Sequence, residues 1–467
     1  MNDFDFDLFI GALYLVAVIL FVLGLKRLAS PKTARSGNCI ASLGMLIAVV
    51  VTLVDREIVS FELIIAGIIV GAIIGSIMAR AIKMTAMPQM VAVFNGLGGA
   101  ASALVAAGVF HGNISDGTDM SMDVSVTIMI GTLIGAVTFS GSLIAFGKLQ
   151  EIIATRPVTF PLQKTFSLLL FVGILAMIGY LVIEPDMTVF IGLSVACLLL
   201  GILLVIPIGG ADMPVVISLL NSYSGLAAAS AGFVLGNVML IIAGALVGAA
   251  GLILTQIMTK AMNRSLVNVV FGAFGAVETV SGSVDPGRET RPVREVAHED
   301  SAVMLAYARS VIFVPGYGLA VAQAQHQLKE LGALIEANGV AVKYAIHPVA
   351  GRMPGHMNVL LAEADVPYDK LYDLEQINDE FSSTDVVVVV GANDVVNPGA
   401  RDDAGSPIYG MPILNVDRAG QVIVLKRSLS PGFAGIDNDL FYKGNTSMLF
   451  GDARESLVRV IAAIEDL

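Results

Sequence analysis

The segment SVIFVPGYGLAV, residues 310–321, decides the fold of the C-terminal part of this chain. It opens with a short apolar run that is typical of a buried strand, and a glycine turn follows at once. In that turn Gly316 and Gly318 stand two residues apart, with Val321 three residues further on. The first glycine permits a tight bend, and the second lets a pyrophosphate approach the backbone where a helix begins. Such a pattern between a strand and a helix predicts a dinucleotide site; a merely structural turn is the alternative.

The residues after this turn continue the alternation of helix and strand. Helical spacing runs over residues 320–338, with Gly339 as the C-cap, and residues 341–346 have the pattern of a second strand. Further strands are predicted at residues 385–390, 412–416 and 421–425. Continuous valine runs suit strands that are buried on both faces of a parallel sheet. The C-terminal part is therefore predicted to be an α/β Rossmann-like parallel-sheet domain with its ligand at the carboxyl ends of the strands.

The sequence also distinguishes between the two nicotinamide nucleotides. Rossmann units that bind NAD carry an acidic residue near the end of the second strand, where it binds the ribose 2′-hydroxyl. Here residues 344–348 contain no acid. The last predicted strand ends in Lys426, Arg427 and Ser428, and two cations with a hydroxyl suit the 2′-phosphate of NADP(H). A solvated charge pair is the alternative for the two cations.

Composition divides the chain into two parts. Of 467 residues, 56% are hydrophobic and only 14% are charged, whereas soluble domains carry roughly 25% charged residues. Long apolar runs fill the chain as far as about residue 262, and ordinary charge density returns from residue 285. We therefore expect a transmembrane domain at residues 1–265, a linker at 266–300 and a soluble domain at 301–467. The net charge of −12 argues against nucleic acid as a partner.

The N-terminal part is predicted to be a polytopic α-helical membrane bundle. A helix that crosses the hydrocarbon core needs about 20 apolar residues. About nine segments qualify, centred near Val18, Ile47, Ile69, Ser102, Leu133, Val172, Ala196, Ala227 and Leu246. The acidic N-terminal residues do not resemble a signal peptide, and neither Cys39 nor Cys197 suggests a disulfide or a metal site.

Loop charges predict the orientation of this bundle. Lys and Arg collect on the cytoplasmic side of membranes. Basic residues follow the first, third, fifth and last spans; they are Lys26, Arg27, Lys32, Arg35, Arg80, Lys83, Lys148, Arg156, Lys164, Lys260 and Arg264. The alternate loops are acidic on balance, as at residues 55–57 and 116–123. With an odd number of spans, the N-terminus is expected outside and the soluble domain in the cytoplasm.

Longer motifs point to one family. They are PGYGLAVAQAQ at 315–325, HPVAGRMPGHMN at 347–358 and GAND at 391–394, with GGADMP at 209–214 and NSYSG at 221–225 in the membrane part. With these motifs the chain resembles, over essentially its whole length, the β subunit of proton-translocating nicotinamide nucleotide transhydrogenase. The resemblance implies the exchange NADH + NADP⁺ ⇌ NAD⁺ + NADPH, coupled to proton passage across a bacterial inner membrane. It also implies that NADP(H) binds this chain in a flipped orientation beneath a lid, and that NAD(H) binds a partner α subunit, in a homodimer of αβ units.

The resemblance carries a set of nucleotide contacts onto this sequence, with Gly432 and Phe433 in the lid and Asp452 and Ala453 on the ribose side. The full set is Gly316, Tyr317, Gly318, Val349, Ala350, Gly351, Arg352, Met353, Pro354, Gly391, Ala392, Asn393, Asp394, Val395, Gly410, Met411, Lys426, Arg427, Ser428, Gly432, Phe433, Asp452 and Ala453. The residues themselves agree with such a reaction. Hydride passing between two nicotinamides needs only apposed rings, and no cluster of an acid–base, nucleophilic or metal-binding kind is evident in the soluble part. His347 and His356 are expected to be structural or solvent-facing.

Polar residues at membrane depth are the candidates for proton passage and coupling, namely Asn95, Asp212, Asn221, Ser222 and Tyr223. Some members of the resembled family have histidine where this chain has Asn95, and asparagine cannot titrate near neutral pH. Asn95 is therefore either a partner in a water wire or an interhelical hydrogen-bonding residue. Asp212 either senses the nucleotide domain or is an acid favoured by a helix dipole.

Two other functions stay open on the sequence. One is a channel or transporter gated by a cytoplasmic Rossmann sensor, which would need a selectivity filter or broken helices at mid-membrane. The other is a membrane-anchored NADP-dependent reductase that acts alone, which would need a catalytic acid. Neither of these features is clear in the sequence.

Overall fold

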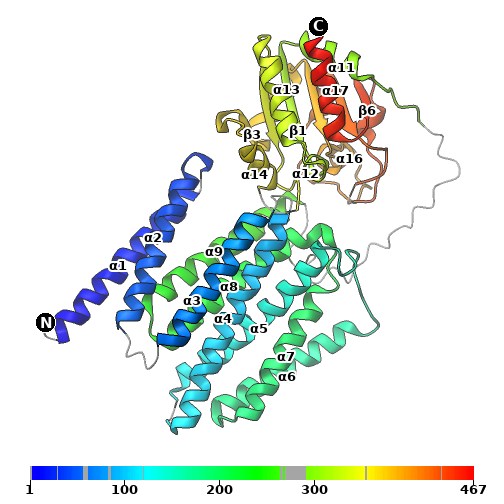
Figure 1. The fold of residues 1–467 in the computed structure, drawn as a ribbon. Coiled ribbons are helices and arrows are strands. Elements are labelled where there is room, and N and C mark those ends of the chain that lie inside the picture. Colours follow the sequence, from blue (N-terminus) through cyan, green and yellow to red (C-terminus); the bar gives the residue numbers. More distant parts are fainter. Residues whose placement is uncertain are drawn as a thin grey trace. The chain divides into compact units, whose positions relative to one another are not determined.

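The computed structural model of the chain describes residues 3–28, 30–55, 61–82, 86–118, 120–262, 266, 269, 291–352, 355–432 and 434–467. These residues form two compact units, Met1–Thr255 and Gln256–Leu467 (Figure 1). The greater part of the predicted linker, residues 270–290, lies outside the described residues.

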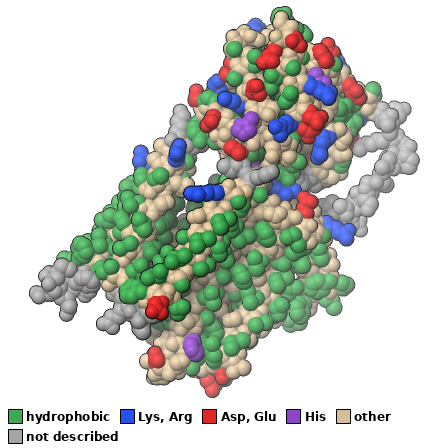
Figure 2. Space-filling model, in the orientation of Figure 1, with side chains coloured by type: hydrophobic (Ala, Val, Ile, Leu, Met, Phe, Trp, Pro, Cys, Tyr) green, Lys and Arg blue, Asp and Glu red, His purple; other side chains and the backbone are tan. Residues whose placement is uncertain are grey.

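The first unit is a bundle of long apolar helices. In the described ranges nine helices are long and apolar enough to cross a membrane, which confirms the predicted number of spans. They are α1 Asp3–Leu28, α2 Pro31–Asp55, α3 Phe61–Ala81, α4 Met87–Asp116, α5 Met122–Leu149, α6 Gln163–Ile183, α7 Met187–Val205, α8 Met213–Leu235 and α9 Val238–Ala261. Hydrophobic side chains cover the visible face of this bundle, whereas charged side chains gather on the second unit (Figure 2). An apolar exterior of this kind suits contact with lipid.

Glycines allow the central helices of the bundle to touch backbone to backbone. A methyl group added to Gly99 of α4 would lie 2.8 Å from the carbonyl oxygen of Gly135 on α5. On α8, a methyl group at Gly225 would lie 2.5 Å from the amide nitrogen of Gly248 on α9. Lipid supplies no hydrophobic drive between helices, so close packing at small residues is what stabilises such contacts.

The second unit is built on a six-stranded sheet in the order β3-β2-β1-β4-β5-β6. The strands are β1 Ser310–Pro315, β2 Ala341–Ile346, β3 Leu371–Asp373, β4 Val386–Val390, β5 Gln421–Lys426 and β6 Thr446–Phe450. Every neighbouring pair is parallel. This is the strand order of a doubly wound Rossmann fold, and it confirms the predicted fold class. The order reverses between β1 and β4, so the ligand crevice of such a fold lies at the carboxyl ends of these two strands.

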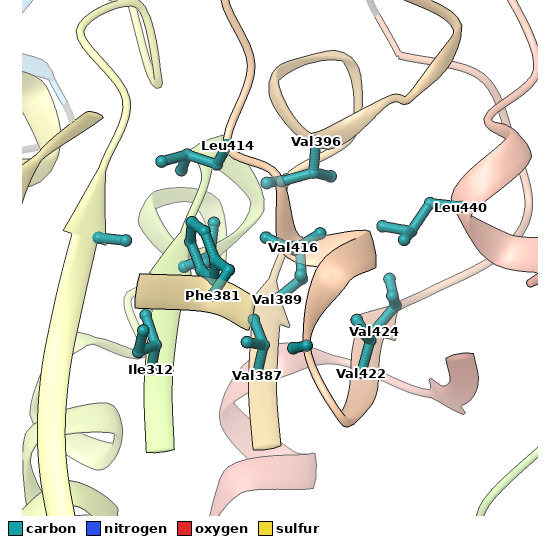
Figure 3. Close-up of a cluster of buried hydrophobic side chains, with 14 of the residues drawn as sticks. Ile312, Phe381, Val387, Val389, Val396, Leu414, Val416, Val422, Val424 and Leu440 are labelled. Atoms are coloured by element: carbon teal, nitrogen blue, oxygen red, sulfur yellow. The ribbon is translucent and has the colours of Figure 1, made fainter. Parts of the chain in front are cut away.

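The valine run of β4 is apolar throughout because both faces of the sheet are covered. On one face Val387 and Val389 join a buried cluster with Phe381, Leu414 and Val416, which come from short 3₁₀ helices and an irregular segment between the strands (Figure 3). The opposite face is covered by α13 (Gln325–Ala337) and α17 (Ala453–Glu465). All five residues of β4 are buried.

Two details of the predicted secondary structure are wrong. The expected helix over 320–338 is split into α12 (Tyr317–Ala322) and α13, because Gln323 adopts the left-handed conformation with φ 51°. Residues 412–416 form no strand. Leu414 from that segment is buried in the core, and its amide donates to the carbonyl oxygen of Val395 at 3.0 Å. The segment is apolar because it is buried, so its sequence looks like that of a strand although it does not pair in the sheet.

The described part of the second unit begins before its first strand. The amide of Val296 donates to the carbonyl oxygen of Met448 on β6 at 3.0 Å, and the amide of Met448 donates to Arg294 at 2.7 Å. Helix α11 (His298–Ala306) then packs on α17. The edge strand β6 is therefore covered by the chain that enters the domain.

Candidate functional site

The loops after β1 and β4 pack against each other at the reversal of strand order. The amide of Gly316 donates to the carbonyl oxygen of Val390 at 2.8 Å, and the amide of Gly318 donates to Gly391 at 2.9 Å. A methyl group on Gly316 would lie 2.5 Å from backbone atoms of Ala392. The sequence suggested that these glycines clear a path for a nucleotide. The structure adds that they also let the two loops forming the crevice approach each other.

A second loop follows β2, and its described part, residues 347–352 and 355, is held by two buried histidines, His347 and His356. The Nε2 atom of His347 donates to the carbonyl oxygen of Pro412 at 2.8 Å, and its Nδ1 accepts from the amide of Val349 at 3.3 Å. The Nδ1 atom of His356 accepts from the amide of Arg352 at 3.0 Å. These partners fix the neutral tautomer of each ring. Both histidines are buried and do not face solvent. They support the loop, so of the two expected roles, structural or solvent-facing, the structural one applies.

The glycine turn and this second loop meet through an aromatic and a cation. The guanidinium carbon of Arg352 lies 4.7 Å from the centre of the Tyr317 ring. The Tyr317 ring is in turn 6.4 Å from the ring of His356, centre to centre. Predicted contact residues from two separate motifs are thus brought together beside the crevice. Met353 and Pro354, also predicted contacts, lie outside the described residues.

The loop after β4 holds the segment predicted to form the lid. The Oδ2 atom of Asp394 accepts from the amide of Ala434 at 3.0 Å. A methyl group on Gly432 would lie 2.5 Å from Oδ1 of the same carboxylate. The side-chain amide of Asn438 donates to Oδ1 of Asn393 at 2.9 Å. Asp394 and Asn393 therefore hold Ala434 and Asn438 against the loop after β4; Phe433 lies outside the described residues.

The carboxyl end of β5 carries the predicted phosphate-binding group. The ammonium of Lys426 donates to the carbonyl oxygen of Ser430 and lies 5.2 Å from the centre of the Phe441 ring. Its partial burial lowers its pKa, although the negative charges of Asp394 and Asp437 act in the opposite direction. Arg427 and Ser428 are exposed. Lys426 is thus turned toward the lid segment, whereas Arg427 is open to a ligand.

The remaining predicted contacts have structural roles in the domain. The amide of Gly410 donates to the carbonyl oxygen of Ala400 at 2.8 Å. Met411 is buried in a small cluster against which Val349 and Val395 pack. The carboxylate of Asp452 caps α17, accepting from the amide of Arg454 at 2.9 Å, and the adjacent Ala453 is buried. Gly351 has φ +115° and packs against His356, so it shapes the second loop.

The buried histidines predict an acid sensitivity of the C-terminal domain. Burial lowers the pKa of His347 and of His356 from 6.5 to about 4. The unfolded chain takes up these protons near pH 6.5 and the folded domain only near pH 4, so stability is lost as pH falls through that window. At about 1.4 kcal/mol per pKa unit, each imidazole accounts for about 3 kcal/mol of that loss. Denaturant unfolding of residues 291–467 at several pH values measures it.

A substitution separates this cause from other titrations. In His347→Gln the fall in unfolding free energy between pH 6.5 and 4 should be about 3 kcal/mol smaller than in the parent domain. His326→Gln, at an exposed site on α13, should leave the fall unchanged. An equally steep fall in the parent domain and in His347→Gln would contradict the assignment.

The membrane bundle contains a polar network between α4, α5 and α8. The side-chain amide of Asn95 donates to the hydroxyl of Ser142 on α5 at 3.1 Å. The hydroxyl of Ser224 on α8 lies 2.6 Å from Oδ1 of Asn95 and 2.8 Å from the carbonyl oxygen of Asn221. Asn95 is thus an interhelical hydrogen-bonding residue in this structure. Ser142 and Ser224 complete the network, and the signal that could have identified both is their polarity inside apolar spans.

The other membrane candidates lie at separate places. The hydroxyl of Ser222 is buried and donates to the carbonyl oxygen of Gly248 on α9 at 2.8 Å. Asp212 ends a short 3₁₀ helix, Gly210–Asp212, and directly precedes α8. Asn221 lies nine residues further along the chain, on α8, which at 1.5 Å per residue is about 14 Å away. Helix α8 therefore carries Asn221 and Ser224 and begins directly after Asp212. In the described ranges no group of His, Cys, Asp and Glu could hold a metal ion.

Comparisons with known proteins agree over nearly the whole chain. Residues 10–463 match a family described as NAD(P) transhydrogenase beta subunit. The chain is 49% identical over 457 residues to NAD(P) transhydrogenase subunit beta of Rhodospirillum rubrum, covering 97% of this chain and 98% of that protein. The same protein from Rhodospirillum rubrum strain ATCC 11170 matches equally.

Proposed function

The chain belongs to the NAD(P) transhydrogenase beta subunit family, and on that premise we propose that its C-terminal domain binds NADP(H) and that its membrane bundle couples hydride exchange to proton passage. The partner alpha subunit that the family name implies would carry NAD(H). The alternative of a channel or transporter gated by a nucleotide sensor is not favoured, because the family is one of enzymes.

The observation that carries the choice of NADP(H) is the distribution of charge at the carboxyl edge of the sheet. Beside the end of β2 stands Asp373 on β3, which pairs in register with Ile346. Asp373 forms a capping box with Gln376 and is thereby engaged at the start of α15 (Leu374–Ile377). The end of β5 instead presents Arg427, a planar cation that suits a phosphate dianion. This edge favours a ribose with a 2′-phosphate over one with a free 2′-hydroxyl.

The proposed hydride exchange requires this chain only to position the nicotinamide ring. A hydride that passes between two nicotinamide rings breaks and forms only carbon–hydrogen bonds, so no acid or base is needed at the reacting carbon. The buried histidines beside the crevice are neutral and hydrogen bonded within the loop, consistent with a supporting role. We propose that the glycine turn, the loop with Arg352 and the lid hold the NADP(H) ring where a ring on the partner subunit can face it.

We propose that α8 links the two activities. It begins directly after Asp212 and carries Ser224, whose hydroxyl touches Asn95 of α4. A ligand can shift an equilibrium only through different affinities for two states. A movement of α8 would change the Asn95 network and the position of Asp212 together. Asn95 cannot titrate, so the protons themselves would be carried by water or by groups on the partner subunit.

The setting follows from the bundle and its charges. We propose a bacterial inner membrane, with the N-terminus outside, the C-terminal domain in the cytoplasm and a homodimer of αβ units. The basic ends of α1 and α3, at Arg27 and Arg80, support this orientation. Three basic residues used to predict it, Lys32, Lys83 and Arg264, have side chains outside the described residues.

The test is exchange in sealed vesicles. The chain with its alpha subunit is reconstituted in proteoliposomes that contain a pH-sensitive dye, and NADPH is supplied with an NAD⁺ analogue whose reduction is visible. We expect reduction of the analogue together with a change of internal pH. Exchange without a pH change would contradict the proposed coupling to proton passage. No exchange at all would contradict the proposed transhydrogenase activity.

Substitutions on α8 test the coupling element. Asp212→Asn and Asn221→Leu should each lower the number of protons moved per hydride transferred, because both alter the helix that joins the two sites. NADPH binding to the separate domain, which contains neither residue, serves as the reference. Wild-type proton transport in both variants would make these residues packing elements.

A further inference from the structure

A lysine in the last turn of α5 is completely buried. Lys148 was counted among the basic loop residues that set the orientation, but the structure places it inside the helix end, with none of its surface exposed. This corrects the prediction for that residue. Lys is almost never fully buried unless its ammonium is paired.

The partners of this ammonium are all backbone carbonyl oxygens. Its Nζ atom donates to Ile206 at 2.5 Å, to Ile208 at 2.7 Å and, more weakly, to Arg156 at 3.4 Å. Within the described ranges no carboxylate forms an ion pair with it. Three donors thus find three acceptors, which is the full capacity of an ammonium.

Two of these acceptors, on Ile206 and Ile208, belong to the turn between α7 and α8, and the third, on Arg156, belongs to the α5–α6 loop. The carbonyls of Ile206 and Ile208 lie at and just beyond the C-terminal end of α7, where a carbonyl oxygen has no N–H donor within the helix and is available to a cation. The same turn is tied to the α5–α6 loop, since the amide of Gly210 donates to the carbonyl oxygen of Thr155 at 2.8 Å. Lys148 therefore joins α5, the α5–α6 loop and the α7–α8 turn at one point.

The turn is the entrance to α8, the proposed coupling helix. Ile208 precedes Asp212 by four residues, and Asn221 and Ser224 follow on the same helix. The hydrogen bonds from Lys148 to the three carbonyl oxygens, here called the Lys148 clamp, hold α8 at its start. About three turns later the Asn95 network holds the same helix. The first attachment is made to α5, and the second is made to Asn95 of α4, whose side-chain amide in turn donates to Ser142 of α5.

We propose that Lys148 is a positioning residue for the coupling of hydride exchange to proton passage: its ammonium fixes the α7–α8 turn against α5 and so sets the position from which α8 responds to the nucleotide. The proposal rests on the proposed function. Removing the ammonium removes all three of these hydrogen bonds, and each loss of a hydrogen bond to a charged group is enough to shift a two-state equilibrium by about tenfold or more.

The experiment compares Lys148→Met with Lys148→Arg in the complete chain, reconstituted with its alpha subunit. Lys148→Met keeps the length and apolar stem of the side chain and removes the charge and the donors. We expect it to lower the protons moved per hydride by about tenfold, while Lys148→Arg restores at least part of the ratio. Lys26→Met, at an exposed basic residue in the last turn of α1, should leave the ratio unchanged.

A structural measurement accompanies the transport measurement. In Lys148→Met, amide hydrogen exchange over residues 203–212 should become faster, whether or not the chain is a transhydrogenase. An unchanged exchange rate there, or a wild-type proton-to-hydride ratio in the folded variant, overturns the proposal. A lower yield of folded protein with a normal ratio per molecule overturns it as well. If the wild type itself exchanges no hydride, the proposed function fails, and faster amide exchange would still show Lys148 to be the clamp.

Discussion

Gly316→Ala is expected to destabilise the C-terminal domain and to abolish tight binding of NADP(H). The added methyl would lie 2.5 Å from Cα and N of Ala392 and from the carbonyl oxygen of Gly391, all backbone atoms that no side-chain rotation can move away. Overpacking of this kind costs about 1–3 kcal/mol. For a domain of this size that is a fall in Tm of roughly 2–4 °C for each kcal/mol. Because the two displaced loops form the crevice, NADPH affinity should fall by at least about tenfold.

The measurement is thermal unfolding and NADPH calorimetry on residues 291–467. Gly444→Ala is the matched control, because nothing lies within 4 Å of the position its methyl would take. It should leave both Tm and affinity nearly unchanged. If Gly316→Ala binds NADPH as the parent does, the close approach of the β1 and β4 loops is not what forms the site.

Arg427→Ala should weaken NADPH binding about 10- to 150-fold, since hydrogen bonds to charged groups contribute roughly 1.5–3 kcal/mol. Binding of NADH, which lacks the 2′-phosphate, should change little. Arg427 is exposed beside the partly buried Lys426, whose ammonium is already engaged with Ser430. We therefore expect the guanidinium to make the larger contribution to discrimination between the two nucleotides.

Calorimetry with NADPH and NADH on the same domain separates the two explanations for this arginine. Arg459→Ala removes an exposed guanidinium from α17 and controls for the change of net charge. Equal loss of affinity in both variants would indicate general electrostatic attraction. An unchanged dissociation constant in Arg427→Ala would make Arg427 one member of a solvated charge pair.

Local patterns were sufficient to predict much of this protein. The apolar runs predicted about nine spans, because a helix must satisfy its backbone inside lipid and needs a fixed length to cross it, and the described residues contain nine helices of that kind. The segment at 310–321 and the valine run at 386–390 determined the parallel sheet, because strands buried on both faces are apolar at every position. The long motifs indicated the family, which the comparisons confirmed.

Other features depended on contacts between residues far apart in the chain. The apolar segment at 412–416 looks like a strand, but Leu414 is buried beneath the sheet instead. Strands β3 and β6 have too little pattern of their own and are defined by pairing with β2 and β5. The neutral state of His347 depends on its burial, and the ring is oriented by the carbonyl of Pro412, 65 residues away. The hydrophobic pattern of a sequence indicates which side chains are buried, but it does not indicate which residues they pack against.

Lys148 shows the same limit in the membrane part. Sequence alone determined that a cation stands at the end of the fifth span, and on a charge count it was one more residue in favour of the predicted orientation. Only the tertiary structure decided that it is buried and bound by carbonyls of the α7–α8 turn, 58 and 60 residues away. The reason is physical: a lysine has the same charge in either place, and the acceptors that permit its burial are backbone atoms, which every sequence possesses and only a fold can assemble.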